Sequence, residues 1–100
     1  MVDLNHIYNV EGNASSPVDY YTSLQTLINA GTWHLQGHFG RSMMDAINEG
    51  RCMLGWVGSR DYYGNRIPAR EDVQEGTKGS YSYVAAQCGT EWAELMKEVR

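Results

Sequence analysis

The segment with the clearest capacity for chemistry is RDYYGNR, residues 60 to 66, which gathers two arginines and two tyrosines around a Gly-Asn turn. Arginine and tyrosine are favoured anchors of protein interfaces, and both stack on nucleic-acid bases. In the structural alternative, one tyrosine packs on the core, the other on its neighbour, and Asp61 pairs with an arginine. The segment is the best binding candidate of the chain, because aromatic side chains on a turn otherwise cost exposed apolar surface.

The surrounding connection, GSRDYYGNRIPAREDVQEGTKG, spans about 20 residues and is too long for a plain link between two elements. Its backbone polar groups could not all be satisfied inside the protein, so it is expected to run over the surface with its side chains available. The predicted contacts on this connection are Arg60, Tyr62, Tyr63, Asn65, Arg66 and Arg70.

A second unusual segment, GTWHLQGHFGR at positions 31 to 41, joins two predicted helices. His34 and His38 are four residues apart, a spacing that aims two rings at one metal on a regular helix. The glycines within the segment argue against a regular helix, and no third ligand lies nearby. We therefore predict no metal site, and expect the glycines to let two helices cross closely while Trp33 closes the core. Trp33, Gln36 and Arg41 are further candidate contacts.

The segment GTKGS, residues 76 to 80, resembles a phosphate-binding loop, since backbone amides beside a lysine can hold an anion. A Walker motif requires the lysine after the second glycine and a helix thereafter, whereas Lys78 precedes that glycine. A turn at the entry of a hairpin is the favoured interpretation. Lys78 is kept as a candidate contact.

Catalytic patterns are not recognisable from spacing: there is no Ser-His-Asp order, carboxylate pair or Cys-His motif. The three histidines, His6, His34 and His38, and the two cysteines could meet in space, but nothing in their spacing requires it. We predict that the protein is not an enzyme and uses no cofactor. Cys52 and Cys88 are expected to be reduced thiols.

Length and composition set the broad class. The 100 residues are 42% hydrophobic and 20% charged, which is typical of one globular domain spanning residues 1 to 100. The net charge of −4 argues against wholesale attraction to nucleic acid or anionic lipid. No membrane span or signal peptide is recognisable, so we expect an intracellular protein without membrane partners.

Two helices are predicted to position the first half of the chain. Ser16 and Pro17 are typical of a helix start, apolar residues then recur at helical spacing, and Gly31 suits a left-handed C-terminal stop. A second helix is expected from about His38 to Glu49, followed by Gly50.

The second half is predicted to form a small antiparallel sheet from residues 51 to 57 and 80 to 86, covered by a helix that begins at Thr90 as cap. The fold class is therefore α+β, with two N-terminal helices, a sheet with a long connecting loop, and a C-terminal helix. Because a two-stranded sheet is marginal alone, we expect a homodimer. The predicted core includes Leu27, Ile28, Trp33, Ile47, Leu54, Trp56 and Leu95.

Residues 24 to 54 are similar to a pattern in small uncharacterised proteins of tailed bacteriophages. That pattern has a helix ending in Leu-Ile-x-x-Gly, then Trp-x-Leu-Gln-Gly-x-Tyr-Gly-Arg, then a second helix ending in Gly. The matching residues are Leu27, Ile28, Gly31, Trp33, Leu35, Gln36, Gly37, Gly40, Arg41, Ile47 and Gly50, with Phe39 where tyrosine is commoner. The resemblance implies a phage origin and no particular mechanism.

A small acidic phage protein without catalytic motifs is expected to act by occupying a surface of a host protein. The predicted function is therefore that of a binding protein in the host bacterial cytoplasm, which inhibits or redirects a bacterial protein or complex, for example as an anti-CRISPR-like antidefence inhibitor. The alternative is a regulatory protein that binds nucleic acid or a nucleotide through the arginines and tyrosines of residues 60 to 66.

Overall fold

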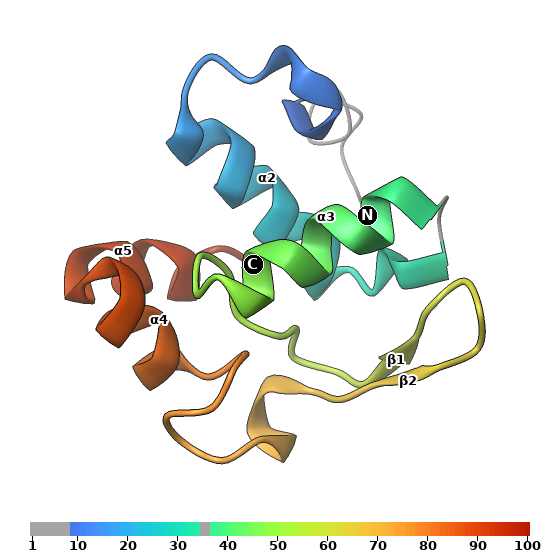
Figure 1. Ribbon diagram of the computed structural model, residues 1–100. Coiled ribbons are helices and arrows are strands. Elements are labelled where there is room, and N and C mark those ends of the chain that lie inside the picture. Colours follow the sequence, from blue (N-terminus) through green and yellow to red (C-terminus); the bar gives the residue numbers. More distant parts are fainter. Residues whose placement is uncertain (1–8, 35–36) are drawn as a thin grey trace.

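The computed structural model describes residues 9–34 and 37–100 and arranges them as a small α+β fold (Figure 1). The expected class is confirmed at this level. The α-helices are α2 (Pro17–Asn29), α3 (Gly37–Asn48), α4 (Tyr81–Cys88) and α5 (Thr90–Lys97). The strands β1 (Ser59–Arg60) and β2 (Arg66–Ile67) form an antiparallel hairpin. Shorter turns are η1 (Asn9–Asn13), η2 (Thr32–His34) and η3 (Arg70–Asp72).

The two helices of the first half form where local residue types predict them. The Ser16 hydroxyl accepts a hydrogen bond from the Asp19 amide at 3.1 Å, and Pro17 occupies the first position of α2. Gly31 follows α2 with φ of 72°, the left-handed conformation expected there. Helix α3 lies within one residue of its predicted bounds at either end, and Gly50 follows it with φ of 76°.

Residues 52 to 55 of the segment from 51 to 57 are buried, but the segment is not the strand that its apolar run predicts. Its central residues lie against α2. There the buried side chain of Gln25 makes the hydrogen bonds that a neighbouring strand would otherwise make. The Gln25 Oε1 atom accepts from the Met53 amide at 2.7 Å, and Gln25 Nε2 donates to the Met53 carbonyl at 2.9 Å. One side-chain amide thus satisfies both backbone groups of Met53.

The rest of this buried segment is satisfied by residues from the long connection. The Leu54 amide donates to the Gly79 carbonyl at 3.0 Å, and the Leu54 carbonyl accepts from Arg70 Nε at 2.8 Å. Gly55 lies so close to α2 that a Cβ atom there would sit 2.7 Å from the Ile28 carbonyl oxygen. A side chain at this position would push the segment away from the helix.

Residues 81 to 86 belong to helix α4, so the second predicted strand, residues 80 to 86, is wrong. Ser80 caps α4, and its hydroxyl accepts from the Tyr83 amide at 3.2 Å. The alternation of serine and tyrosine is typical of a strand, but in α4 the two tyrosines contact different parts of the protein. The Tyr81 hydroxyl donates to Glu94, and the Tyr83 hydroxyl donates to the Asn48 carbonyl. The N-cap bond decides the local structure in favour of a helix.

The observed sheet is the hairpin of β1 and β2, which lies inside the long connection, where no strand is predicted from the sequence (Figure 1). Ser59 pairs with Ile67 and Arg60 pairs with Arg66. The predicted sheet, from which the homodimer was inferred, does not form. The homodimer itself is not tested by the structure of a single chain and stays a prediction.

The C-terminal helix is confirmed, although its cap is Gly89 rather than Thr90. Five of the seven predicted core residues are buried: Leu27, Ile28, Trp33, Ile47 and Leu54. The prediction is wrong for Trp56, which is 47% exposed, and for Leu95, which is 37% exposed. Trp56 lies outside the core because residues 51–57 turn toward the surface after Gly55, and in α5 the buried positions are Ala93 and Met96.

We expect Gln25→Leu to lower the free energy of unfolding by about 2 kcal/mol or more, because it leaves a buried amide and a buried carbonyl of Met53 without partners. Urea denaturation measures the change. Gln74→Leu is the matched control, since Gln74 is exposed. A loss of stability no larger for Gln25→Leu than for this control would contradict the role assigned to Gln25.

Candidate functional site

The tip of the hairpin is a short loop held by backbone hydrogen bonds. Between the two strands, the Asp61 amide donates to the Asn65 carbonyl at 2.9 Å, and the Gly64 amide donates to the Asp61 carbonyl at 3.0 Å. Gly64 has φ of 84°, which completes a three-residue connection of a kind common in hairpins. The turn therefore presents Tyr62 and Tyr63 in one defined arrangement.

The Asp61 carboxylate holds this loop together from within. It accepts hydrogen bonds from the Tyr63 amide at 2.9 Å, the Asn65 amide at 2.8 Å and the Asn65 side-chain amide at 3.2 Å. Partial desolvation raises the pKa of Asp61, but the hydrogen bonds from Asn65, Tyr63 and Gly64 outweigh it and hold the pKa below its usual 3.8. Asp61 and Asn65 thus determine the shape of the loop.

Tyr62 and Tyr63 are the exposed residues of this turn. Tyr62 is 64% exposed and Tyr63 is 76% exposed, and their rings meet edge to face with centroids 5.3 Å apart. This contact orders the rings against each other while most of each ring stays open to solvent. Exposed aromatic surface of this size is typical of an interaction site.

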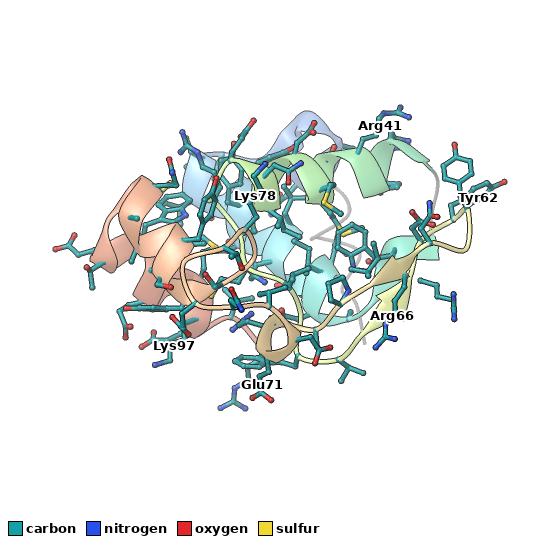
Figure 2. All side chains as sticks on the ribbon, turned by 60° about the horizontal axis from the view of Figure 1, so that its bottom comes forward. Arg41, Tyr62, Arg66, Glu71, Lys78 and Lys97 are labelled. Atoms are coloured by element: carbon teal, nitrogen blue, oxygen red, sulfur yellow. The ribbon has the colours of Figure 1, made fainter. Side chains whose placement is uncertain are left out.

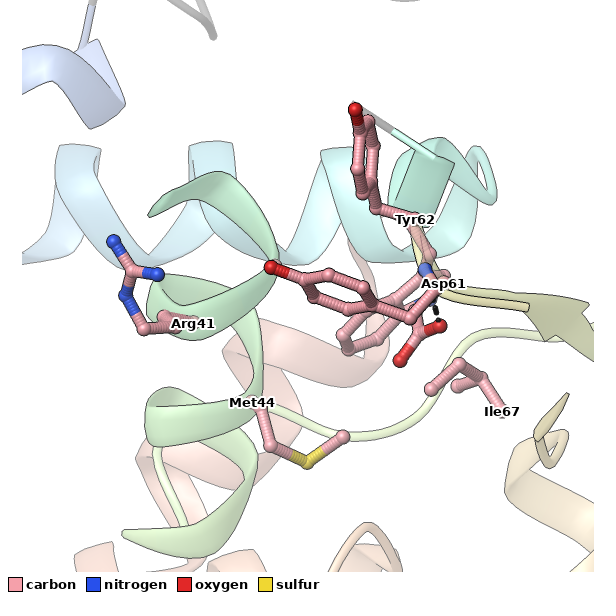
Figure 3. A pocket seen from close by; sticks show the side chains of 8 residues that line it. Arg41, Met44, Asp61, Tyr62 and Ile67 are labelled. Atoms are coloured by element: carbon pink, nitrogen blue, oxygen red, sulfur yellow. Dashed lines mark hydrogen bonds between the residues drawn. The ribbon is translucent and has the colours of Figure 1, made fainter. Parts of the chain in front are cut away.

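A mostly apolar hollow of about 200 Å³ lies between the hairpin and α3. We call this hollow and its rim the hairpin surface; its residues are Trp33, Gly40, Arg41, Met44, Asp61, Tyr62, Tyr63 and Ile67. Figure 3 shows Arg41 and Met44 on α3, with Asp61, Tyr62 and Ile67 across from them. Gly40 and Arg41 lie four and three residues before Met44, so both are neighbours of Met44 on the surface of the helix.

Four of the predicted contacts meet at the hairpin surface. Trp33 and Arg41 come from the junction between α2 and α3, whereas Tyr62 and Tyr63 come from the hairpin. Trp33 is only 3% exposed and Arg41 is exposed. Two segments that the sequence marks separately therefore form one surface. The predicted contact Gln36 lies outside the described residues.

Two further predicted contacts, Arg60 and Arg66, lie directly opposite each other on the strands below the tip, and both are exposed. Arg60 Nη1 donates to the Gly64 carbonyl at 3.0 Å. Arg66 projects from the hairpin at the same end of the molecule as Tyr62 (Figure 2).

The expectation that all side chains of the connection are available is wrong for Arg70, which is 9% exposed. Its Nε atom donates to the Leu54 carbonyl, and its guanidinium group stacks on the ring of Trp56 at 3.9 Å. Burial lowers the pKa of Arg70 to about 10, so the group remains a cation at neutral pH. Arg70 is buried because it satisfies the carbonyl of a segment that has no strand partner.

Lys78 is exposed but lies away from the hairpin, as Figure 2 shows. In the segment GTKGS, the Gly76 amide donates to the hydroxyls of Ser80 and Ser82 at 3.1 and 2.6 Å, and the Ser80 amide donates to the Thr77 carbonyl. These amides are therefore already used within the protein. The segment forms the entry to α4, not to a hairpin.

No group of three or more histidine, cysteine or acidic side chains is placed to hold a metal within residues 9–34 and 37–100. His6 and the side chain of His34 lie outside the described residues, so whether they meet His38 is not tested. Cys52 is buried and its thiol donates weakly to the Tyr21 carbonyl at 3.5 Å. Burial raises the pKa of Cys52, with a further increase from Cys88, whereas Arg70 lowers it.

Comparison with known proteins gives no match: no family model fits the chain, and no curated protein or solved structure is significantly similar to it. In the part of the chain that the structure describes, no helix is long and apolar enough to cross a membrane. The function of the hairpin surface therefore has to be inferred from its own geometry.

Sequence reasoning missed the residues that close the hollow, Met44 and Ile67, and the role of Asp61. A signal for Ile67 was present, because an exposed arginine followed by an apolar residue is typical of a strand with one buried face. Met44 lies three residues after Arg41, on the same side of α3. What was missing was the knowledge that the hairpin and α3 are neighbours.

Because of the hydrogen bonds that it accepts, we expect the Asp61 carboxylate to titrate below its usual pKa. The ordered turn is favoured above pH 3.8 and is lost as the pH falls through the lower pKa of the folded protein, because protonation removes acceptor capacity. We expect the amide resonances of Tyr63 and Asn65 to shift together with a midpoint below pH 3.8, and the step to be absent in Asp61→Ala. A midpoint at or above 3.8 would contradict this structure of the turn.

The two cysteines should differ in reactivity, because thiolate is the reactive form and only Cys88 is partly exposed. With a chromogenic disulfide reagent at pH 8, we expect one thiol to react quickly and the second only after denaturation. Cys88→Ser should remove the fast phase, and Cys52→Ser should retain it. Equal rates for both thiols in the native protein would show that Cys52 is accessible.

Proposed function

We propose that this protein is a binding protein whose hairpin surface docks on a partner protein. The observation that carries the proposal is the pair of largely exposed tyrosines at the edge of an apolar hollow. Tyrosine contributes large contact area with few rotatable bonds, and a hollow beside it can accept one apolar side chain of the partner. No catalytic group is needed for such a role.

The ordered turn supports this function. Asp61 and Asn65 hold Tyr62 and Tyr63 in place before any partner arrives, so little conformational freedom is lost on binding. A purely structural turn would gain more from packing the two rings on the core. Here the hydrogen bonds of Asp61 instead stabilise a turn in which both rings are exposed to solvent.

The more specific form of the proposal is that the protein comes from a phage and inhibits or redirects a host bacterial factor, as an antidefence protein does. The resemblance at residues 24 to 54 supports it, and that stretch contains Trp33 and Arg41 of the hairpin surface. The mechanism would be steric: the protein covers a surface that the bacterial factor needs for its own partner or substrate.

A nucleic-acid-binding function is the second candidate, favoured by the arginines beside the tyrosines. Bases stack on exposed aromatic rings, and Arg41, Arg60 and Arg66 could neutralise phosphates. Against it, the chain carries a net charge of −4. The ratio of absorbance at 260 and 280 nm of the purified protein tests whether nucleic acid is retained.

The test of the proposal is affinity capture from a bacterial lysate with three baits: the unchanged protein, Tyr62→Ala/Tyr63→Ala, and the control Val18→Ala. Val18 is 41% exposed on α2, outside the hairpin surface. We expect a partner protein that the first and third baits retain and the double variant loses, with binding weakened about thirtyfold, the effect of losing about 2 kcal/mol.

The salt dependence of binding then identifies the class of partner. A shallow fall in affinity with rising salt is expected for a protein surface, and a steep fall would indicate nucleic acid. Binding that is equal for all three baits, together with a lower melting temperature of the double variant, would show that the tyrosines are structural and would overturn the proposal.

A further inference from the structure

The two arginines below the tyrosine turn form a feature that the proposed docking surface does not explain. Arg60 and Arg66 are direct cross-strand partners, so their side chains leave the same face of the hairpin. Both are exposed, and together with Gly58 and Ser59 they line a shallow depression next to the strands. Like charges directly opposite each other destabilise a strand pair. The hairpin therefore carries an electrostatic cost at this position.

No group of the described chain neutralises this pair. Among residues 9–34 and 37–100, neither arginine forms an ion pair, and Arg66 makes no hydrogen bond there. The nearest acidic residue in sequence, Asp61, already accepts bonds from Tyr63 and Asn65. Arg60 uses one of its donors on the Gly64 carbonyl. A guanidinium group has five N–H donors, so most donors of the pair remain free for an external anion.

We propose that Arg60 and Arg66 form a clamp for carboxylate groups on an acidic segment of the partner protein. The choice of partner rests on the proposed function, whereas the anion site itself rests on the arginine pair alone. The planar guanidinium fork matches a carboxylate with two parallel hydrogen bonds. The arginine pair lines a depression that shares no residue with the apolar hollow, so the clamp is a separate site on the other face of the hairpin.

The charge of the chain favours a protein segment over a nucleic acid. Outside the hairpin and Arg41, acidic residues outnumber basic ones, and the net charge of the whole chain is −4. A nucleic acid carries a long row of phosphates that would extend over this repulsive surface. A short acidic segment of a protein meets only the positive end of the molecule.

In the first test, a hexaglutamate peptide is titrated into the free protein, and binding is monitored by nuclear magnetic resonance. We expect saturable shifts confined to residues 59 to 67, and affinity at least about tenfold weaker in Arg66→Gln, since each bond to a charged group contributes substantially. Lys78→Gln is the matched control, because it removes one exposed positive charge away from the hairpin. Equal weakening by both variants would show a general charge effect and overturn the clamp.

An oligothymidylate with six phosphates is the comparison probe at the same salt concentration. Weaker binding of this probe than of hexaglutamate supports a protein segment. Tighter binding, with the same dependence on Arg66, would assign the arginines to nucleic acid and overturn the proposal.

A second readout separates a binding role from a structural one. Arg66→Glu converts the like-charged pair into an ion pair with Arg60, so we expect a higher melting temperature and no binding of hexaglutamate. A lower melting temperature with unchanged peptide binding would show that the arginines support the hairpin only. Tyr62→Ala/Tyr63→Ala should retain hexaglutamate binding, so the clamp can be upheld even if the tyrosines prove not to contact a partner.

Discussion

The structure depends on the hydrogen bonds between the buried side chain of Gln25 and the backbone of Met53. The segment around Met53 passes through the core without a neighbouring strand, and a buried peptide group without partners would be costly. Gln25 donates and accepts at the two points where a strand would do so. Because the geometry of both bonds must hold at once, the segment can lie against α2 in only one register, and everything that follows it starts from that position.

Asn29, one turn after Gln25 on α2, extends this constraint to the rest of the chain. Its Oδ1 atom accepts from Gln25 Nε2 at 3.0 Å and from Arg70 Nη2 at 3.5 Å, while its Nδ2 atom donates to the Val99 carbonyl. Arg70 in turn holds the Leu54 carbonyl and so places the chain directly after the hairpin. The network thus holds the base of the hairpin against the core, whereas the tip is shaped by Asp61. A rigid base with an ordered, exposed tip presents a binding surface that needs little rearrangement.

The candidate site was predictable as a set of residue types, but not as a place. Tyr62 and Tyr63 stand out in the sequence because aromatic residues on a polar turn have no local reason to be there, and they are exposed as expected. Trp33 and Arg41 stand out for a different reason, the glycine-rich junction between two helices. Their meeting in one hollow follows from how α3 lies against the hairpin. Arg70 shows the opposite case, since its loop-like surroundings in sequence gave no sign of its buried role.

The sequence by itself determined the elements whose bonds are local. Helix α2 begins at Ser16 and Pro17 and ends before Gly31, because a side-chain cap, a restricted φ angle and a left-handed glycine act within a few residues of one another. The tertiary structure alone decided the state of residues 51–57. The backbone of an apolar run can form its hydrogen bonds with a neighbouring strand or with a side chain distant in sequence. Here the partner is Gln25, 28 positions away from Met53. Hydrogen bonds over such separations depend on how the helices pack, which no local pattern of residues specifies.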